Sequence, residues 1–198
     1  MKKFCFLIVA GCFILSSISF SAENKEAKEI LMVADFNAGK KPSNIGGDFG
    51  SWDKDPKDTT QTCLISFSKK EKVGEKGYSL RIDYDVDSPN PAWNGAWFKL
   101  NGIDITPYKF LNISIKGDKK KGFTEVMKLE LKNKEGEVGI YYITGIEDKW
   151  KNFKIPLEEF IGITDFSKMS EFVIVFEDVK ATKKKGTIYI DNIYFSKK

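Results

Sequence analysis

The sequence predicts an all-β protein, a two-sheet antiparallel jelly-roll β-sandwich made by one domain from residue 31 to the C-terminus. Short runs of β-forming residues recur along the chain, and Gly, Pro, Asn and Asp separate them. In most runs apolar and polar residues alternate, as they do in a strand with one buried face. Only the segment 157–166 has the pattern of a helical turn. Many short strands almost without helix are typical of a sandwich.

The first four expected strands are 30–36, 62–68, 78–86 and 95–100. The first opens the domain with the apolar run ILMVADF, and the second, TCLISFS, is rich in β-formers. The third, YSLRIDYDV, sets Leu80, Ile82, Tyr84 and Val86 on one face and Ser79, Arg81, Asp83 and Asp85 on the other. The fourth, GAWFKL, sets Ala96, Phe98 and Leu100 against Trp97 and Lys99.

The next six expected strands are 110–117, 126–132, 138–144, 151–157, 171–177 and 187–195. FLNISIKG, KNFKIPL, EFVIVFE and TIYIDNIYF are β-rich runs bounded by turn residues. VMKLELK sets Met127, Leu129 and Leu131 against Lys128, Glu130 and Lys132. In VGIYYIT, one face carries Ile140 and Tyr142 and the other carries Tyr141 and Ile143. We assign Tyr141 to the polar face.

The N-terminus has the three parts of a secretory signal peptide, which we assign to residues 1–22. Two lysines precede an apolar run, 4–15, and a small-residue stretch follows it. This run is too short to span a bilayer, which needs about 20 apolar residues. The domain is therefore expected to be exported, with a short polar spacer at 23–30. Alternatively, VAGC at 9–12 is a lipoprotein box that would anchor the chain through an acylated Cys12.

The composition excludes several classes of function. The chain has no His, so it cannot form a Ser-His-Asp triad or a His-ligated zinc site. Its three Cys cannot supply four thiolates, and Cys63 alone would remain beyond the leader, without an internal disulfide. Arg81 is the single Arg among 32 basic residues, which face 28 acidic ones. This mixed, lysine-rich charge does not favour nucleic-acid binding.

Large aromatic side chains stand on the polar faces of several expected strands. Trp97 and Tyr141 are out of phase with the apolar sets, and Trp93 shares the side of Trp97 if its strand extends that far. Such a ring is either covered by a neighbouring segment or is a platform for the apolar face of a sugar. Sugar hydroxyl groups need charged or amide partners. The predicted ligand-binding residues are Trp93, Trp97, Tyr141, Arg81, Asp83 and Glu130, with Trp52 of the loop GSWDKD as the alternative anchor.

Several segments, in their order and spacing, are similar to a known family. They are VADFNAG, NIGGDFGSW, GYSLRIDY, WNGAWFKL, ITPYKFLNISIKGD, WKNFKIPLEEF, MSEFVIVF and GTIYIDNIYF. Over about residues 31–196 the chain resembles the jelly-roll carbohydrate-binding modules of the galactose-binding-like superfamily, to which the complex I intermediate-associated protein domain is related. The resemblance implies a two-sheet sandwich with a ligand surface on the concave sheet or at loop tips.

The resemblance also implies one structural calcium ion near the ends of the domain. Asp191 of the closing motif matches an acid that helps to bind the ion in many relatives, and Asp35 lies in the opening strand. Asn37 stands where relatives often have an acid. Ca²⁺ takes six to eight oxygen ligands, many of them backbone carbonyls. The alternative is that Asp191 and Asn192 form a β-bulge or turn whose side chain bonds its own backbone.

We therefore expect an exported, monomeric, non-catalytic module that binds a polysaccharide on aromatic residues of the concave sheet. No pair of carboxylates is marked as a glycosidase pair, and no glycine-rich phosphate loop is present. Two alternatives remain open: an exported interaction or adhesion domain that binds a protein, and a small glycoside-active enzyme.

Overall fold

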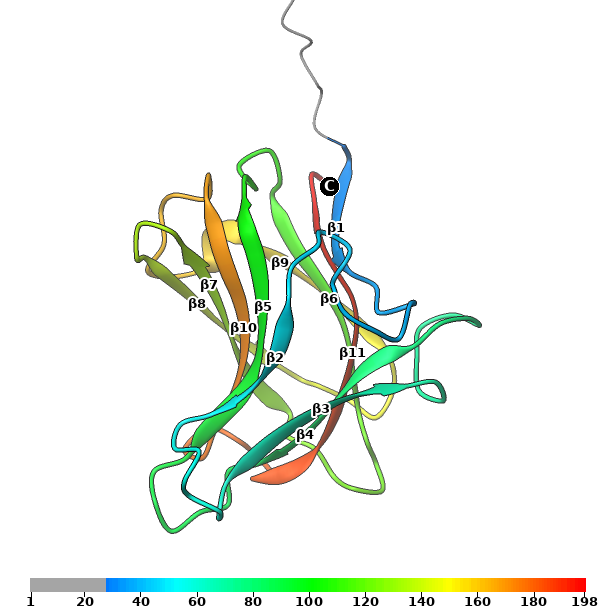
Figure 1. Cartoon of the computed structure of the whole chain (residues 1–198), viewed down its shortest axis with the longest axis vertical. Helices are drawn as coiled ribbons and strands as arrows, with labels where there is room; N and C mark the ends of the chain where they lie inside the picture. Colours follow the sequence, from blue (N-terminus) through cyan, green and yellow to red (C-terminus); the bar gives the residue numbers. More distant parts are fainter. Residues whose placement is uncertain (1–27) are drawn as a thin grey trace, which may run out of the picture.

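The computed structural model describes residues 28–198 as two antiparallel β-sheets packed face to face, which confirms the predicted all-β sandwich (Figure 1). The expected signal peptide 1–22, with the alternative anchor Cys12, and most of the spacer 23–30 lie outside the described residues. Between residues 28 and 198 no helix has both the length and the apolar character needed to cross a membrane.

One sheet, the front sheet, has five strands. Their order across the sheet is β2 (Phe49–Asp53), β5 (Trp93–Ile103), β10 (Met169–Glu177), β7 (Val126–Asn133) and β8 (Val138–Thr144). Sequence neighbours β7 and β8 are adjacent, whereas β10 enters between β5 and β7 from far along the chain. This crossover places side chains from three distant segments on one continuous surface.

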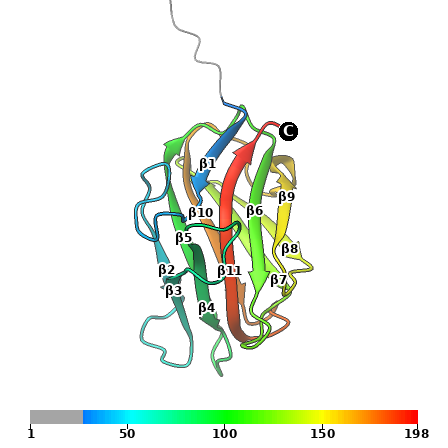
Figure 2. The same cartoon turned by 90° about the vertical axis from the view of Figure 1, so that its right-hand side faces the viewer.

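The other sheet, the back sheet, faces the viewer in Figure 2. Its order is β3 (Thr62–Ser68), β4 (Ser79–Asp85), β11 (Lys185–Ser196), β6 (Phe110–Gly117) and β9 (Lys151–Pro156), and β1 (Ile30–Ala34) pairs with β11. The predicted helical turn is a single 3₁₀ turn, Leu157–Glu159. The first and last strands therefore lie side by side in this sheet.

The core lies between the sheets and follows the alternation of the sequence. In β7, Met127, Leu129 and Leu131 are buried between the sheets, while the residues between them point outward. In β10 the inner set is Phe172 and Phe176 with Ile174 between them. Cys63 is also buried, as a small apolar side chain. Two inner faces of this kind, closed against each other, form one hydrophobic core.

Strand β2 is an element that the sequence pattern did not indicate. Its residues, FGSWD, include poor β-formers, so the segment was expected to be a loop. It pairs with β5 along its whole length, and the Phe49 ring stacks on Phe98 with ring centroids 5.6 Å apart. Trp52 is therefore a strand residue, and the loop assignment was wrong. Tertiary packing overrides the weak propensity of the segment.

The expected face of Tyr141 was also wrong. Tyr141 packs against the core cluster, with its ring centroid 5.7 Å from that of Phe160. Ile143, which shares the face of Tyr141 in β8, is 1% exposed. Tyr142 points outward, opposite Lys128 of β7. Both sets of β8 are apolar, so alternation alone could not choose the buried one. The pairing with β7 determines which face of β8 is buried, because it sets Tyr141 opposite Leu129 of the core.

Substitution Phe98→Ala should lower the free energy of unfolding by about 3–5 kcal/mol, the range for an emptied aromatic core site. Phe98 is fully buried and touches the rings of Phe49 and Phe172. Chemical denaturation measures the change. Lys109→Ala, at an exposed position, is the control and should change stability little. A loss as small as that of the control would contradict the core assignment.

Candidate functional site

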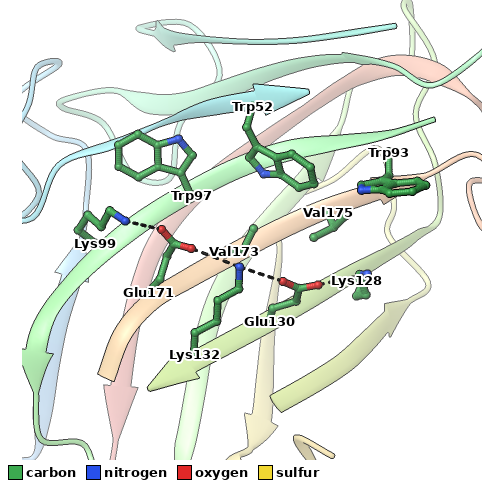
Figure 3. A pocket seen from close by; sticks show the side chains of 10 residues that line it. All are labelled: Trp52, Trp93, Trp97, Lys99, Lys128, Glu130, Lys132, Glu171, Val173 and Val175. Atoms are coloured by element: carbon green, nitrogen blue, oxygen red, sulfur yellow. Dashed lines mark hydrogen bonds and ion pairs between the residues drawn. The ribbon is translucent and has the colours of Figure 1, made fainter. Parts of the chain in front are cut away.

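Three tryptophans lie in a row along a groove on the outer face of the front sheet (Figure 3). Trp52 comes from β2, and Trp93 and Trp97 come from β5. The groove has a volume of about 440 Å³ and also takes in outward residues of β10 and β7. Trp93 and Trp97, predicted as the sugar platform, and Trp52, predicted as the alternative anchor, therefore form one surface.

The strand register makes room for the indole rings. Gly50 of β2 is opposite Trp97, and Gly95 of β5 is opposite Trp52. A Cβ atom on Gly50 would lie 2.8 Å from Cζ2 of Trp97, so the indole lies directly over the glycine. A Cβ atom on Gly95 would lie 1.8 Å from the Ile174 carbonyl oxygen, so only glycine lets β5 approach β10 there. Two positions without side chains thus set the shape of the aromatic row.

The rings are partly open to solvent and carry lysines at their faces. Trp93 is 38% exposed, and the Lys54 ammonium lies 4.0 Å from its ring centroid. The Lys99 ammonium lies 5.3 Å from the Trp97 ring. Cation–π contacts of this kind are worth about 0.5–1 kcal/mol at exposed sites, which is enough to orient a ring without closing it to a ligand.

The floor of the groove is made by two valines of β10. Val173 and Val175 point to the outer face, opposite Trp97 and Gly95, yet each is only 2% exposed. They are covered by the side chains that line the groove (Figure 3). The sequence did not identify them, because EFVIVFE is apolar on both faces and gives no alternation.

A chain of ion pairs, called here the charge ladder, runs across the groove beside the tryptophans. Lys99 Nζ lies 2.8 Å from Glu171 Oε1, and Lys132 Nζ lies between Glu171, at 3.3 Å, and Glu130, at 3.4 Å. Lys128 Nζ continues the ladder to Glu130, at 3.2 Å, and to Glu177, at 2.9 Å. Figure 3 shows the first four of these contacts as dashed lines.

Lys128 is the most enclosed lysine of the ladder. Burial alone would lower the pKa of its ammonium, but hydrogen bonds to Glu177 and Glu130 outweigh burial and raise the pKa above the ordinary value. Tyr142 completes this end of the ladder, since its hydroxyl donates to Glu177 Oε2 over 2.9 Å. The ladder thus keeps charged donors and acceptors in fixed positions on the sheet.

The arrangement suits a ring-shaped ligand with one apolar side and a polar rim. Indole faces offer contact to C–H groups, and aromatic contacts add about 0.5–1.5 kcal/mol beyond area burial. Carboxylates and ammonium groups at the side offer strong hydrogen bonds to hydroxyls. Of the predicted polar partners, Glu130 lies in this groove.

Arg81 and Asp83, the other predicted polar partners, do not lie in the groove. Both are in β4, on the outer face of the back sheet, where Arg81 Nη2 donates to Asp83 Oδ1 over 2.8 Å. Thr187 Oγ1 also donates to this carboxylate. The expectation that they stand beside Trp97 was wrong, because alternation within a strand does not reveal in which sheet the strand lies.

The predicted calcium residues come together at the opposite sheet. Asp35 follows β1 and Asp191 is in β11, at a point where the pairing with β6 shifts register and Asn192 has a φ of 47°. Asp191 Oδ1 accepts the Asn192 N–H over 2.9 Å, and Oδ2 accepts the Val73 N–H over 2.9 Å. The bulge is therefore present, as one alternative predicted.

The charges at this place also fit a hard cation. Burial, opposed by those two hydrogen bonds and assisted by the negative charge of Asp35, raises the pKa of Asp191 to about 6. Among the described residues neither carboxylate has a lysine or arginine within ion-pair distance. No cluster of three or more His, Cys, Asp or Glu able to hold a metal occurs in 28–198, so carbonyl groups and water would supply the other ligands.

Solved structures with the same architecture include carbohydrate-binding modules. The family 11 module from Clostridium thermocellum, in complex with a β-1,3-1,4-mixed-linked tetrasaccharide, is 18% identical with a TM-score of 0.64, over 86% of this chain and 96% of that chain. The CBM22-1 xylan-binding domain of Xyn10C from Paenibacillus barcinonensis is 14% identical with a TM-score of 0.51, over 87% and 98%. These likenesses confirm the fold.

No curated protein sequence matches the chain. The model of one protein family, carbohydrate binding domain 30, matches residues 43–197 and so covers every strand except β1 and every residue of the tryptophan groove. The chain belongs to the carbohydrate binding domain 30 family.

Proposed function

We propose that the tryptophan groove is the surface on which this carbohydrate-binding module holds a polysaccharide. The observation that carries the proposal is the row of Trp52, Trp93 and Trp97 on one open face, with the charge ladder along its side. Three rings in a row contact several successive sugar units, so a chain binds better than a single sugar. Stacking contacts of about 1 kcal/mol each, together with hydrogen bonds from sugar hydroxyl groups to the charged side chains, are expected to give weak affinities in the micromolar to millimolar range.

The ligand class that we propose is a neutral β-linked glycan. The family 11 module is known with a β-1,3-1,4-mixed-linked tetrasaccharide and the CBM22-1 domain binds xylan, which makes these two glycans the first to test. The groove itself favours an uncharged chain, because its lysines and glutamates are already paired with one another.

We also propose that the module is non-catalytic and exported. Glu130 and Glu171 are each held between two lysines, an arrangement for accepting hydrogen bonds from hydroxyl groups. Appearance of new reducing ends on incubation with mixed-linkage glucan, lost in Glu130→Gln, would contradict the first point. Export, with lipid anchoring through Cys12 as the alternative, rests on the pattern of residues 1–22. The relation to the complex I intermediate-associated protein domain and the monomeric state stay predictions.

Substitution Trp97→Ala should abolish binding of mixed-linkage glucan in affinity electrophoresis while leaving the thermal midpoint nearly unchanged. The Trp97 ring lies on the outer face, over Gly50, and fills no space between the sheets. Trp150→Ala, which removes the tryptophan outside the groove, is the matched control and should keep full affinity. Unchanged affinity in Trp97→Ala would mean that the glycan binds elsewhere.

Substitution Glu130→Gln should weaken glycan binding about 10-fold or more, since a hydrogen bond to a charged group contributes about 1.5–3 kcal/mol. The same change also opens the ladder between Lys128 and Lys132. Calorimetric titration with the tetrasaccharide measures the effect. Asp83→Asn on the back sheet is the control and should keep full affinity. An equal loss of affinity in Asp83→Asn would mean that the glycan binds on the back sheet, which would contradict the proposal.

We propose that Asp35 and Asp191 help to hold one calcium ion, and the pH dependence of stability tests this. Without metal, the raised pKa of Asp191 means that folding favours the protonated acid. Its contribution to stability is present in full below the ordinary value of 3.8 and is lost as the pH rises through about 6.

The expected outcome is that, in chelator, Asp191→Asn loses less stability than the wild type between pH 4 and pH 7. Added Ca²⁺ should raise the thermal midpoint of the wild type at pH 7 and much less at pH 4, because it binds the ionised acid. An equal response of wild type and variant to Ca²⁺ would count against the ion.

A further inference from the structure

Three buried side-chain oxygens at one end of the sandwich have no hydrogen-bond partner among the described residues. They are Asp53 Oδ1, Gln61 Oε1 and Asn94 Oδ1. Asn94 is fully buried and Gln61 is 4% exposed. Buried acceptors without donors are rare in folded proteins, and each one needs an explanation.

The strand pairing brings the three residues that carry these oxygens into one neighbourhood. Asp53, the last residue of β2, is directly opposite Asn94 at the start of β5, and both lie on the inner side of the front sheet. The Asn94 amide reaches across to β3, where its Nδ2 donates to the Thr62 carbonyl over 3.0 Å. Gln61 immediately precedes Thr62 and is buried like Cys63, so it faces the same interior. The lower ends of β2, β3 and β5 meet at this point in Figure 1.

The orientation of both amides follows from their donors. Asn94 Nδ2 also donates to the Asp85 carbonyl over 2.7 Å, and Gln61 Nε2 donates to Asp58 Oδ2 over 2.9 Å. Neither amide can be turned around without placing an oxygen against these acceptors. The atoms left without partners are therefore oxygens, and all three are acceptors.

A cation explains this set better than a water molecule. One water donates only two hydrogen bonds, which leaves one of three acceptors unsatisfied, whereas a cation attracts all three oxygens. Asp53 adds a negative charge that has no lysine or arginine within ion-pair distance in the described part of the chain.

The donor set points to a hard cation. Carboxylate and amide oxygens are the ligands of Ca²⁺, and water can complete its six to eight positions. Cys63 is buried close by, but its sulfur is not among the three unpartnered acceptors, which are all oxygens. We propose that Asp53, Gln61 and Asn94 hold a hard metal cation of the Ca²⁺ type between β2, β3 and β5.

This site differs from the one proposed at Asp35 and Asp191, which is on the back sheet. It lies directly under the groove, since Asp53 follows Trp52 and Asn94 follows Trp93 in the chain. A cation here would fix the two strand ends whose neighbouring residues are two of the three indoles. Its presence does not depend on what the groove binds.

Calcium binding by the full chain in the Asp191→Asn background isolates the site. Equilibrium dialysis with Ca²⁺ should show one bound ion per chain, with a dissociation constant of about 10⁻⁴–10⁻³ M, the weak end of the range for protein calcium sites. Adding Asp53→Asn should weaken binding at least 10-fold. Asp55→Asn, which removes an equal charge in the next exposed turn, is the matched control and should leave binding unchanged. Undiminished Ca²⁺ binding after Asp53→Asn would overturn the proposal.

Terbium luminescence gives a second, spatial readout. Tb³⁺ replaces Ca²⁺ and emits when a nearby tryptophan is excited, so an ion under Trp52 and Trp93 should luminesce under tryptophan-selective excitation. Gln61→Leu, which removes an acceptor but no charge, should reduce the Tb³⁺ luminescence at a fixed Tb³⁺ concentration. This variant tests the site if Asp53→Asn fails to fold. Equal signals from Gln61→Leu and the parent chain would contradict the site.

Discussion

The register between β2 and β5 is the constraint on which the groove depends. It sets Gly50 opposite Trp97 and Gly95 opposite Trp52, so each ring meets a position without a side chain. Because the side-chain period of a strand is two, a slip by one residue would turn every indole of one strand into the core. The stacking of Phe49 on Phe98, on the inner face of the same two strands, holds this register. Core packing and ligand surface are therefore two faces of one pairing.

The crossover of β10 provides the rest of the surface. By entering between β5 and β7 it brings Val173 and Val175 under the indoles and places Glu171 between Lys99 and Lys132. The groove thus has an aromatic side, an apolar floor and a charged side, each from a different part of the chain. A flat ring with polar edges matches that order of surfaces.

Much of the fold could be predicted from alternation, whereas the site could be predicted only in part. β7 shows why the first succeeded: Met127, Leu129 and Leu131 leave no doubt about its buried face. In β8 both faces are apolar, and the choice of Tyr141 failed because the partner strand decides which face is buried. Arg81 and Asp83 were placed beside Trp97 because sequence does not assign strands to sheets. β2 was missed because its strand state comes from packing against β5 and not from its own residues.

A chemical-shift titration of the indole N–H groups with the β-1,3-1,4-mixed-linked tetrasaccharide shows directly whether the tryptophan groove holds the glycan. The chain has four tryptophans, three in the groove and Trp150 outside it. Shifts of the Trp52, Trp93 and Trp97 indole signals along one binding curve, with the Trp150 signal unmoved, are the predicted result. Saturable binding that leaves those three signals in place and perturbs backbone amides of β4 instead would contradict the account.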